Sequence, residues 1–139
     1  MLAQGTGGDI VYVVSKNSVV AGPKNIAYSA AKADQAHQVR LLAAELAEFG
    51  IRVNAVNPDA VVKGSGIFSG EWLEQRAAAY KVAPEDLGKF YASRTLLGEE
   101  VLPEHIAAAV AVLLEGALAR PTGLTINVDG GLATAFLPR

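Results

Sequence analysis

The sequence predicts an α/β protein built as part of a doubly wound parallel sheet. Three observations lead to this prediction. Two valine-rich runs of strand length, 9–15 and 51–57, flank a long segment rich in Ala, Leu and Glu. That order is the strand–helix–strand pattern of parallel sheets, whose crossovers are right-handed. A third short strand pattern, 124–128, follows another helical segment.

The first elements follow from local composition. The run 9–15 is apolar throughout rather than alternating, which predicts a central parallel strand covered on both faces. After a loop at 22–23, helix-forming residues predict a helix over about 25–49, with Gly50 placed to end it. The second strand is expected over 51–57, where Pro58 stops it.

A long connection follows the second strand. Segment 59–98 is glycine-rich at first and is expected to hold two short helices, one over 71–80 and one from Pro84 to about 93. Connections of this length between core elements commonly form lids over a site. Pro103 then starts a helix that runs through Leu114.

Composition narrows the class of protein. The 139 residues suit one domain, and they are 51% hydrophobic but only 19% charged, against about 25% charged in typical soluble domains. This excess predicts surface that is buried by a missing half or by another subunit. The net charge of −2 argues against nucleic-acid binding. No cysteine, signal peptide or membrane-length apolar run is present, so we expect a cytoplasmic protein.

The chemistry is expected around Ser15, Tyr28 and Lys32. Tyr28 and Lys32 are four residues apart in a helical pattern, so both side chains leave the same helix face. Ser15 ends the first strand pattern. A hydroxyl that holds an alcohol or carbonyl oxygen, a phenol that passes a proton and an ammonium that favours the phenolate would together perform acid–base catalysis. The alternative is an ordinary surface pair of aromatic and cation.

The same spacing occurs once more, at Tyr12 and Lys16. Those residues lie on or beside a strand, where four positions separate Cα atoms by about 13 Å. We therefore expect no cooperation between them. For Ser15 and Tyr28 the topology adds support, because ligands of such sheets bind at the carboxyl ends of the strands.

Read in order, several blocks of this sequence resemble the second half of a short-chain dehydrogenase/reductase, with its Rossmann-like fold. These blocks are Ser15, 27–32, 51–58 and 122–131. A finer resemblance is to the dehydrogenase portion of bifunctional rhamnulose-1-phosphate aldolase/alcohol dehydrogenases. It is carried by 15–17, 57–61, Trp72 with 76–80, and the ending 136–139. The resemblance implies that residues 1–139 form the carboxyl-terminal half of the domain, with a lid over about 59–98.

The resemblance also implies roles for individual residues. Tyr28 would be the acid/base, Lys32 would favour the phenolate and hold the nicotinamide ribose, and Ser15 would position the substrate oxygen, with Asn17 beside it. The cofactor would be NAD, with NADP left open, and it would contact Tyr28, Lys32, Pro58, Asp59, Ala60 and Val61. Trp72 would lie in the substrate lid. The alternatives are that Ser15 caps the strand end, Pro58 only stops the second strand, and Trp72 only packs the lid.

The implied substrate is a small alcohol or hydroxyaldehyde, such as lactaldehyde, or a sugar. The family resemblance also implies a homo-oligomer, a dimer or tetramer, with the Tyr28 helix and the end of the chain as contact surfaces. His37 and His105 lie in helical patterns with nothing nearby to suggest a metal site.

The sequence departs from the family pattern in several places. Asp59 stands where the family usually has Gly, and Lys63 where many members carry a cofactor-contacting Thr. The glycine-rich pyrophosphate turn and the catalytic Asn belong to the first half of the domain, and Gly64 and Gly66 do not replace that turn. A second hypothesis is therefore a non-catalytic fragment or assembly module. Calorimetric titration with NAD and NADP separates the two.

Overall fold

The computed structural model describes residues 1–21 and 24–132. The expected loop at 22–23 and the ending 136–139 lie outside these residues. The strands are β1 (Gly8–Val13), β2 (Ile51–Pro58) and β3 (Thr125–Val128). The α-helices are α1 (Ile26–Leu46), α2 (Gly70–Tyr80), α3 (Leu87–Ala92) and α4 (Pro103–Leu114). Short 3₁₀ turns are η1 (Lys16–Ser18), η2 (Ala47–Phe49) and η3 (Pro84–Asp86).

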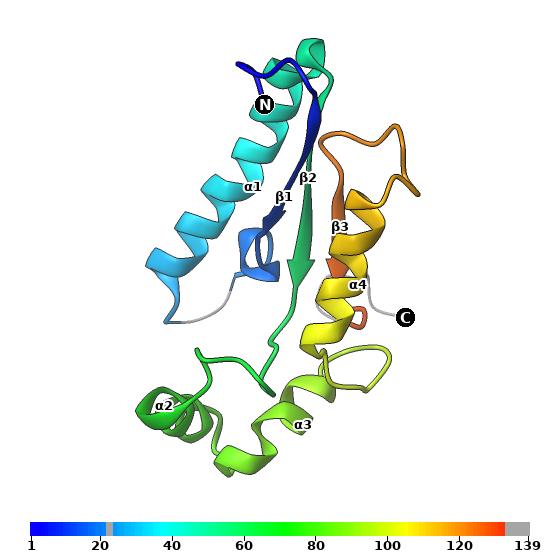
Figure 1. The fold of residues 1–139 in the computed structure, drawn as a ribbon. Helices are drawn as coiled ribbons and strands as arrows, with labels where there is room; N and C mark the ends of the chain where they lie inside the picture. Colours follow the sequence, from blue (N-terminus) through cyan, green and yellow to red (C-terminus); the bar gives the residue numbers. More distant parts are fainter. Residues whose placement is uncertain (22–23, 133–139) are drawn as a thin grey trace.

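The three strands form one parallel sheet in the order β1-β2-β3. Val56 of β2 pairs with Val13 on one side and with Ile126 on the other. Helices α1 and α4 cover opposite faces of this sheet, and α2 and α3 lie beyond the carboxyl ends of the strands (Figure 1). The predicted α/β fold with flanking helices and a helical insertion is confirmed.

One expectation about the sheet stays a prediction. The apolar run 9–15 indicates a central strand, and among the described residues β1 pairs on one side only, with β2. Every residue of β2 is buried or nearly so, whereas Val13 at the end of β1 is 51% exposed. An apolar composition indicates that a strand is covered by other parts of the protein. It does not show which parts cover it.

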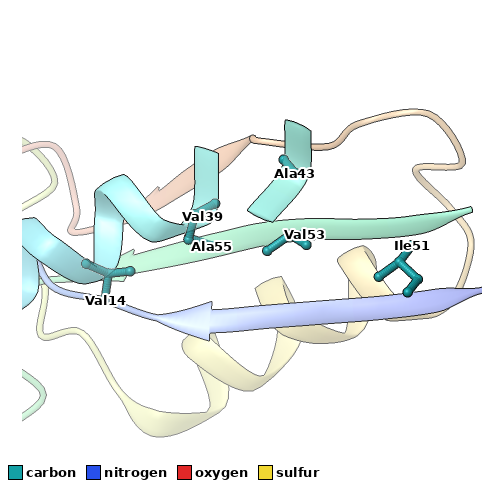
Figure 2. Close-up of a cluster of buried hydrophobic side chains, with 6 residues drawn as sticks. All are labelled: Val14, Val39, Ala43, Ile51, Val53 and Ala55. Atoms are coloured by element: carbon teal, nitrogen blue, oxygen red, sulfur yellow. The ribbon is translucent and has the colours of Figure 1, made fainter. Parts of the chain in front are cut away.

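The largest core cluster lies between α1 and the sheet. It consists of small and β-branched side chains: Val14, Val39, Ala43, Ile51, Val53 and Ala55 (Figure 2). Val39 and Ala43 are four residues apart, so one face of α1 packs on β2. The small residues allow the helix to approach the strand closely. This packing fixes the position of α1, and with it Tyr28 and Lys32 at its first turns.

The turn from α1 into β2 follows the sequence prediction. Helix α1 continues through η2 to Phe49, and Gly50 adopts a left-handed conformation with φ of 67°. Gly7 faces this turn, and a Cβ on Gly7 would lie 2.7 Å from the Gly50 carbonyl oxygen. The crossing therefore needs glycine at both positions. Strand β2 is one residue longer than expected, because Pro58 still pairs with Val128.

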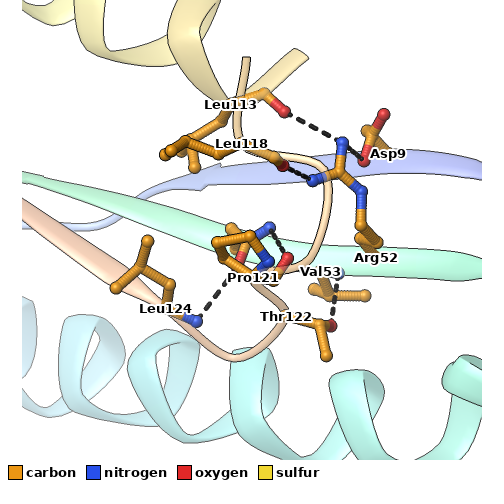
Figure 3. Close-up of polar contacts among 9 residues, drawn as sticks. Asp9, Arg52, Val53, Leu113, Leu118, Pro121, Thr122 and Leu124 are labelled. Atoms are coloured by element: carbon orange, nitrogen blue, oxygen red, sulfur yellow. Dashed lines mark hydrogen bonds and ion pairs between the residues drawn. The ribbon is translucent and has the colours of Figure 1, made fainter. Parts of the chain in front are cut away.

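Arg52 joins β2 to β1, to the end of α4 and to the segment after α4, at the amino-terminal end of the sheet (Figure 3). Its guanidinium group lies 2.7 Å from the Asp9 carboxylate of β1. It also donates to the Leu118 carbonyl oxygen and, at 3.3 Å, to the Leu113 carbonyl oxygen at the end of α4. A cation at a helix C-terminus is favoured by the exposed carbonyl groups there. Arg52 thus holds the edge of the sheet that lies opposite the carboxyl ends.

Helix α1 also presents apolar residues away from the core. Ile26 and Leu41 are among the exposed large hydrophobic residues of the chain. This surface is consistent with the predicted oligomer contact on this helix, which stays a prediction. Among the described residues, no helix is both long and apolar enough to cross a bilayer.

Candidate active site

A cavity of about 390 Å³ lies at the carboxyl ends of β1 and β2, between the first turns of α1 and the lid helices. All nine residues that the sequence assigned to catalysis, cofactor or substrate line it: Ser15, Asn17, Tyr28, Lys32, Pro58, Asp59, Ala60, Val61 and Trp72. They come from four segments of the chain that are far apart in sequence. The cavity brings them together because parallel strands end at the same edge of the sheet.

Ser15 follows β1 in an extended conformation and is buried. Its Oγ accepts a hydrogen bond of 3.2 Å from the Asn17 amide, so it caps η1. A hydroxyl that accepts one hydrogen bond can still donate its proton. Ser15 therefore acts as a cap, as the alternative interpretation expected, and can also offer a donor to the cavity.

Tyr28 and Lys32 lie one turn apart on α1. The Lys32 ammonium is 5.8 Å from the Tyr28 ring centroid, and 40% of Tyr28 is exposed at the cavity. Lys32 donates to the Val13 carbonyl oxygen at 3.1 Å and to Gln35 Oε1 at 2.9 Å. Partial burial lowers the pKa of Lys32. The bond to Val13 fixes the ammonium between helix and strand end, beside the phenol.

Tyr12 and Lys16 do not form a second such pair. The Tyr12 hydroxyl lies 3.5 Å from Gln38 Oε1 of α1, outside the cavity. Lys16 turns instead toward the end of β2, where it forms an ion pair with Asp59. The expectation that these two residues act separately is confirmed.

The ion pair between Lys16 and Asp59 was not foreseen. Asp59 was expected to contribute its backbone, as the family's Gly would, yet its carboxylate is almost fully buried against the Lys16 ammonium. The Lys16 ammonium also lies 5.4 Å from the Tyr91 ring centroid. A signal was present in the sequence, since a cation follows the first strand and an anion follows the neighbouring one.

The lid side of the cavity is aromatic. Phe68 packs edge-to-face on Trp72 and Tyr91, at ring-centroid distances of 6.3 and 6.0 Å. Tyr80 lies 5.7 Å from Tyr91 in the same way. Trp72 therefore packs within the lid and lines the cavity at once. Such edge-to-face contacts between rings are favourable and hold α2 against α3.

Three functional candidates of the lid were missed, namely Arg76, Tyr91 and Arg94, all of which line the cavity. Burial, followed by the neighbouring Tyr80 phenol, raises the pKa of Tyr91. Lys63, the departure from the family's Thr, is exposed and does not line the cavity.

The two histidines have structural contacts away from the cavity. His37 Nδ1 lies 3.1 Å from an Arg40 guanidinium nitrogen on the surface of α1. His105 Nδ1 accepts a hydrogen bond of 3.1 Å from the Leu102 amide at the start of α4.

A hydroxyl, a phenol and an ammonium thus line one cavity at the carboxyl edge of a doubly wound sheet, which is the arrangement of an α/β enzyme acting on an alcohol or carbonyl oxygen. Residues 1–133 match the family described as enoyl-(acyl carrier protein) reductase. The chain belongs to the short-chain dehydrogenase/reductase family of oxidoreductases.

Individual relatives agree with this assignment. The uncharacterized oxidoreductase YuxG of Bacillus subtilis is 48% identical over 136 residues, which are 98% of this chain and 20% of that protein. The NAD-dependent glycerol dehydrogenase of Listeria innocua is 34% identical over 94% of this chain and 46% of its own length.

Among solved structures, sorbitol-6-phosphate 2-dehydrogenase from Erwinia amylovora superposes with a TM-score of 0.81 and is 29% identical. That match covers 96% of this chain and 51% of the other. The chain therefore spans about half the length of these two dehydrogenases and a fifth of YuxG.

Proposed function

We propose that residues 1–139 are the carboxyl-terminal half of a nicotinamide-dependent short-chain dehydrogenase, with a lid over about 59–98. The enzyme would interconvert a small alcohol or hydroxyaldehyde with its oxidised form. The observation that chiefly supports the proposal is the cavity that Ser15, Tyr28 and Lys32 share. The buried residues Val14 and Ser15 after β1, the first turns of α1 and the lid helices bound this cavity.

In the proposed mechanism Ser15 donates a hydrogen bond to the substrate oxygen. Tyr28 gives its proton to that oxygen when a carbonyl is reduced, and takes the proton when an alcohol is oxidised. Lys32, held by the Val13 carbonyl group, stabilises the phenolate between these steps. The nicotinamide, when bound, supplies or accepts the hydride at the substrate carbon.

The residues present fit a nicotinamide. Pro58, Ala60 and Val61 give the cavity apolar lining after β2, and Lys32 of α1 lines the same cavity. The second carboxylate oxygen of Asp59 is buried and has no hydrogen-bond partner among the described residues. An acceptor of that kind suits the carboxamide NH₂ of the ring. Tyr28, Lys32 and the segment 58–61 would therefore hold the cofactor, NAD in the first instance, with NADP open.

The finer proposal concerns the substrate and the whole protein. This chain covers 46% of the glycerol dehydrogenase but only 20% of YuxG, so YuxG carries a long further region. The proposed kinship with bifunctional rhamnulose-1-phosphate aldolase/alcohol dehydrogenases rests on the sequence blocks 15–17, 57–61 and Trp72 with 76–80. The substrate would then be lactaldehyde or a related sugar, and the enzyme a cytoplasmic homo-oligomer.

The test is Tyr28→Phe in the full-length enzyme, with Tyr12→Phe as the matched control. Loss of the general acid/base should lower kcat by about 10²- to 10⁴-fold. The affinity for NAD should change little, because the phenyl ring stays in place. Tyr12 also stands four residues before a lysine but lies outside the cavity, so its variant should retain turnover. Near-normal turnover of Tyr28→Phe would remove Tyr28 from the mechanism.

The second hypothesis, a non-catalytic module, is favoured by the share of its relatives that the chain spans. Calorimetric titration of residues 1–139 with NAD and NADP distinguishes the two. Micromolar binding would contradict the module hypothesis, and absence of binding would support it for this segment.

A further inference from the structure

Two arginine side chains face the cavity from the lid without an acidic partner. Arg76, on α2, donates a hydrogen bond of 3.0 Å to Asn25 Oδ1, three residues before Tyr28. Arg94 follows α3, and no side-chain hydrogen bond or ion pair involves it among the described residues. Both arginines are partly exposed, so water can hydrate their guanidinium groups, and a ligand in the cavity could take the place of that water.

The charge of the cavity is strongly unbalanced. The described residues that line it include four cations, Lys16, Lys32, Arg76 and Arg94, but one anion, Asp59. Asp59 is already paired with Lys16, and Lys32 is assigned to the phenol and the cofactor. The two arginines therefore remain as positive charges without an assigned function. The chain as a whole carries a net charge of −2, so this positive cavity is a local feature.

Both guanidinium groups are held in place by aromatic rings. The Arg76 guanidinium carbon lies 4.7 Å from the Trp72 ring centroid, and that of Arg94 lies 5.8 Å from the Tyr91 ring centroid. Contact with an aromatic ring leaves the N–H groups at the edge of a guanidinium free for a ligand. Both arginines line the same cavity as Tyr91. A carboxylate or a phosphate is the group that such donors bind in a bidentate manner.

We propose that the substrate carries an anionic group, a carboxylate or a phosphate, and that Arg76 and Arg94 bind it on the lid side of the cavity. This proposal rests on the proposed dehydrogenase function and keeps its acid–base residues, but it replaces the neutral lactaldehyde or sugar that the resemblance implies with an anionic substrate of that same site. Ser15 and Tyr28 would hold the reacting alcohol, and the arginines would hold the charged end. The lid would then select against neutral alcohols of the same length.

The experiment compares three substrates with one carbon skeleton on the full-length enzyme: glycerol, glycerate and glycerol 3-phosphate. The wild type should show a kcat/KM at least about tenfold higher for one of the anions than for glycerol, since hydrogen bonds to charged groups contribute this much or more. The better of the two anions identifies carboxylate or phosphate. Arg76→Gln and Arg94→Gln should each remove most of this preference, measured as the ratio of kcat/KM for the anion to kcat/KM for glycerol.

Arg120→Gln is the matched control, because Arg120 is exposed and lies outside the cavity. It should leave the preference unchanged. A preference for glycerol in the wild type, or an anion preference that persists in both cavity variants, would overturn the proposal.

A binding measurement separates this proposal from the proposed function. Calorimetric titration of Tyr28→Phe with the same three compounds measures anion affinity without turnover. If an anion binds and Arg94→Gln weakens it about tenfold, the anion site stands even where no hydride transfer is found. If both anions bind no more tightly than glycerol, the anion site fails even where the dehydrogenase activity is present.

Discussion

Lys16 and Asp59 form an ion pair that joins the turn after β1 to the residue after β2. The Lys16 side chain is 12% exposed and that of Asp59 only 2%. The Lys16 ammonium of this pair lies 5.4 Å from the Tyr91 ring centroid, and both residues line the cavity. An ion pair therefore joins the two strand ends that bear Ser15 and Pro58, in addition to the backbone hydrogen bonds of the sheet.

Removing one partner of this pair should destabilise the protein more than removing both. Asp59→Ala leaves the Lys16 ammonium buried and unpaired, and should lower the free energy of unfolding by about 3–5 kcal/mol. The double variant Asp59→Ala with Lys16→Met removes the stranded charge and should recover much of that loss. Urea denaturation of the full-length protein measures both. Equal losses in the single and double variants would show that the pair does not couple these strand ends.

Arg52 should be sensitive even to a conservative replacement. Arg52→Lys keeps the charge but cannot reach Asp9, Leu113 and Leu118 together, because an ammonium is a single point of donation. The free energy of unfolding should fall by about 1.5–3 kcal/mol, the contribution of hydrogen bonds to a charged group. Arg40→Lys on the exposed surface of α1 serves as the control and should change stability by less than about 0.5 kcal/mol.

The order of elements was predictable because each one carries its own local signal. The apolar runs predict strands, the segment before Gly50 predicts a helix, and Pro103 predicts the start of α4. Each of these signals is contained in neighbouring residues of the sequence. The convergence of Ser15, Tyr28 and Pro58 was also predictable, since parallel strands end at one edge. The neighbours of β1 in the sheet were not, because they are decided by segments outside its own sequence.

Side-chain pairs between distant segments were predictable only in part. The sequence places Lys16 and Asp59 after neighbouring strands, but their contact depends on the register of β1 against β2. Arg94 lines the cavity because the connection from α2 to α3 places α3 beside it, and the sequence does not show the path of that connection. Composition indicated a lid over 59–98, but it did not show which of its charged residues turn inward.

Asn54 should be irreplaceable in β2, since it holds the segment that leads into β3. Its amide donates to the Pro121 carbonyl oxygen and accepts from the Leu124 amide, both at 3.0 Å. Asn54→Leu removes both hydrogen bonds, whose backbone partners are partly exposed, at a cost of about 0.5–1.5 kcal/mol for each. Hydrogen exchange should also accelerate at the Leu124 amide but not at the Val53 amide, which donates to Thr122 Oγ1. Unchanged exchange at Leu124 would show that the bond is not needed.

Tyr91 should make the stability of the protein fall at high pH. Burial, and after it the Tyr80 phenol, raises the pKa of Tyr91 above its ordinary value of about 10. Above that pH the unfolded chain releases the phenolic proton while the folded protein still holds it. Stability due to this group is therefore complete below about pH 10 and is lost as the pH rises further, by up to about 1.4 kcal/mol per pH unit. Tyr91→Phe removes this loss.

The measurement is the free energy of unfolding of the full-length wild type and of Tyr91→Phe between pH 8 and pH 11. Titrating groups away from this site contribute equally to both proteins, so the difference between them reports Tyr91 together with its neighbour Tyr80. That difference should be constant up to about pH 9.5 and should then shift in favour of the variant, because only the wild type must keep a buried phenol protonated against rising pH. Parallel profiles up to pH 11 would mean that water reaches the Tyr91 hydroxyl and that the lid does not seal this side of the cavity.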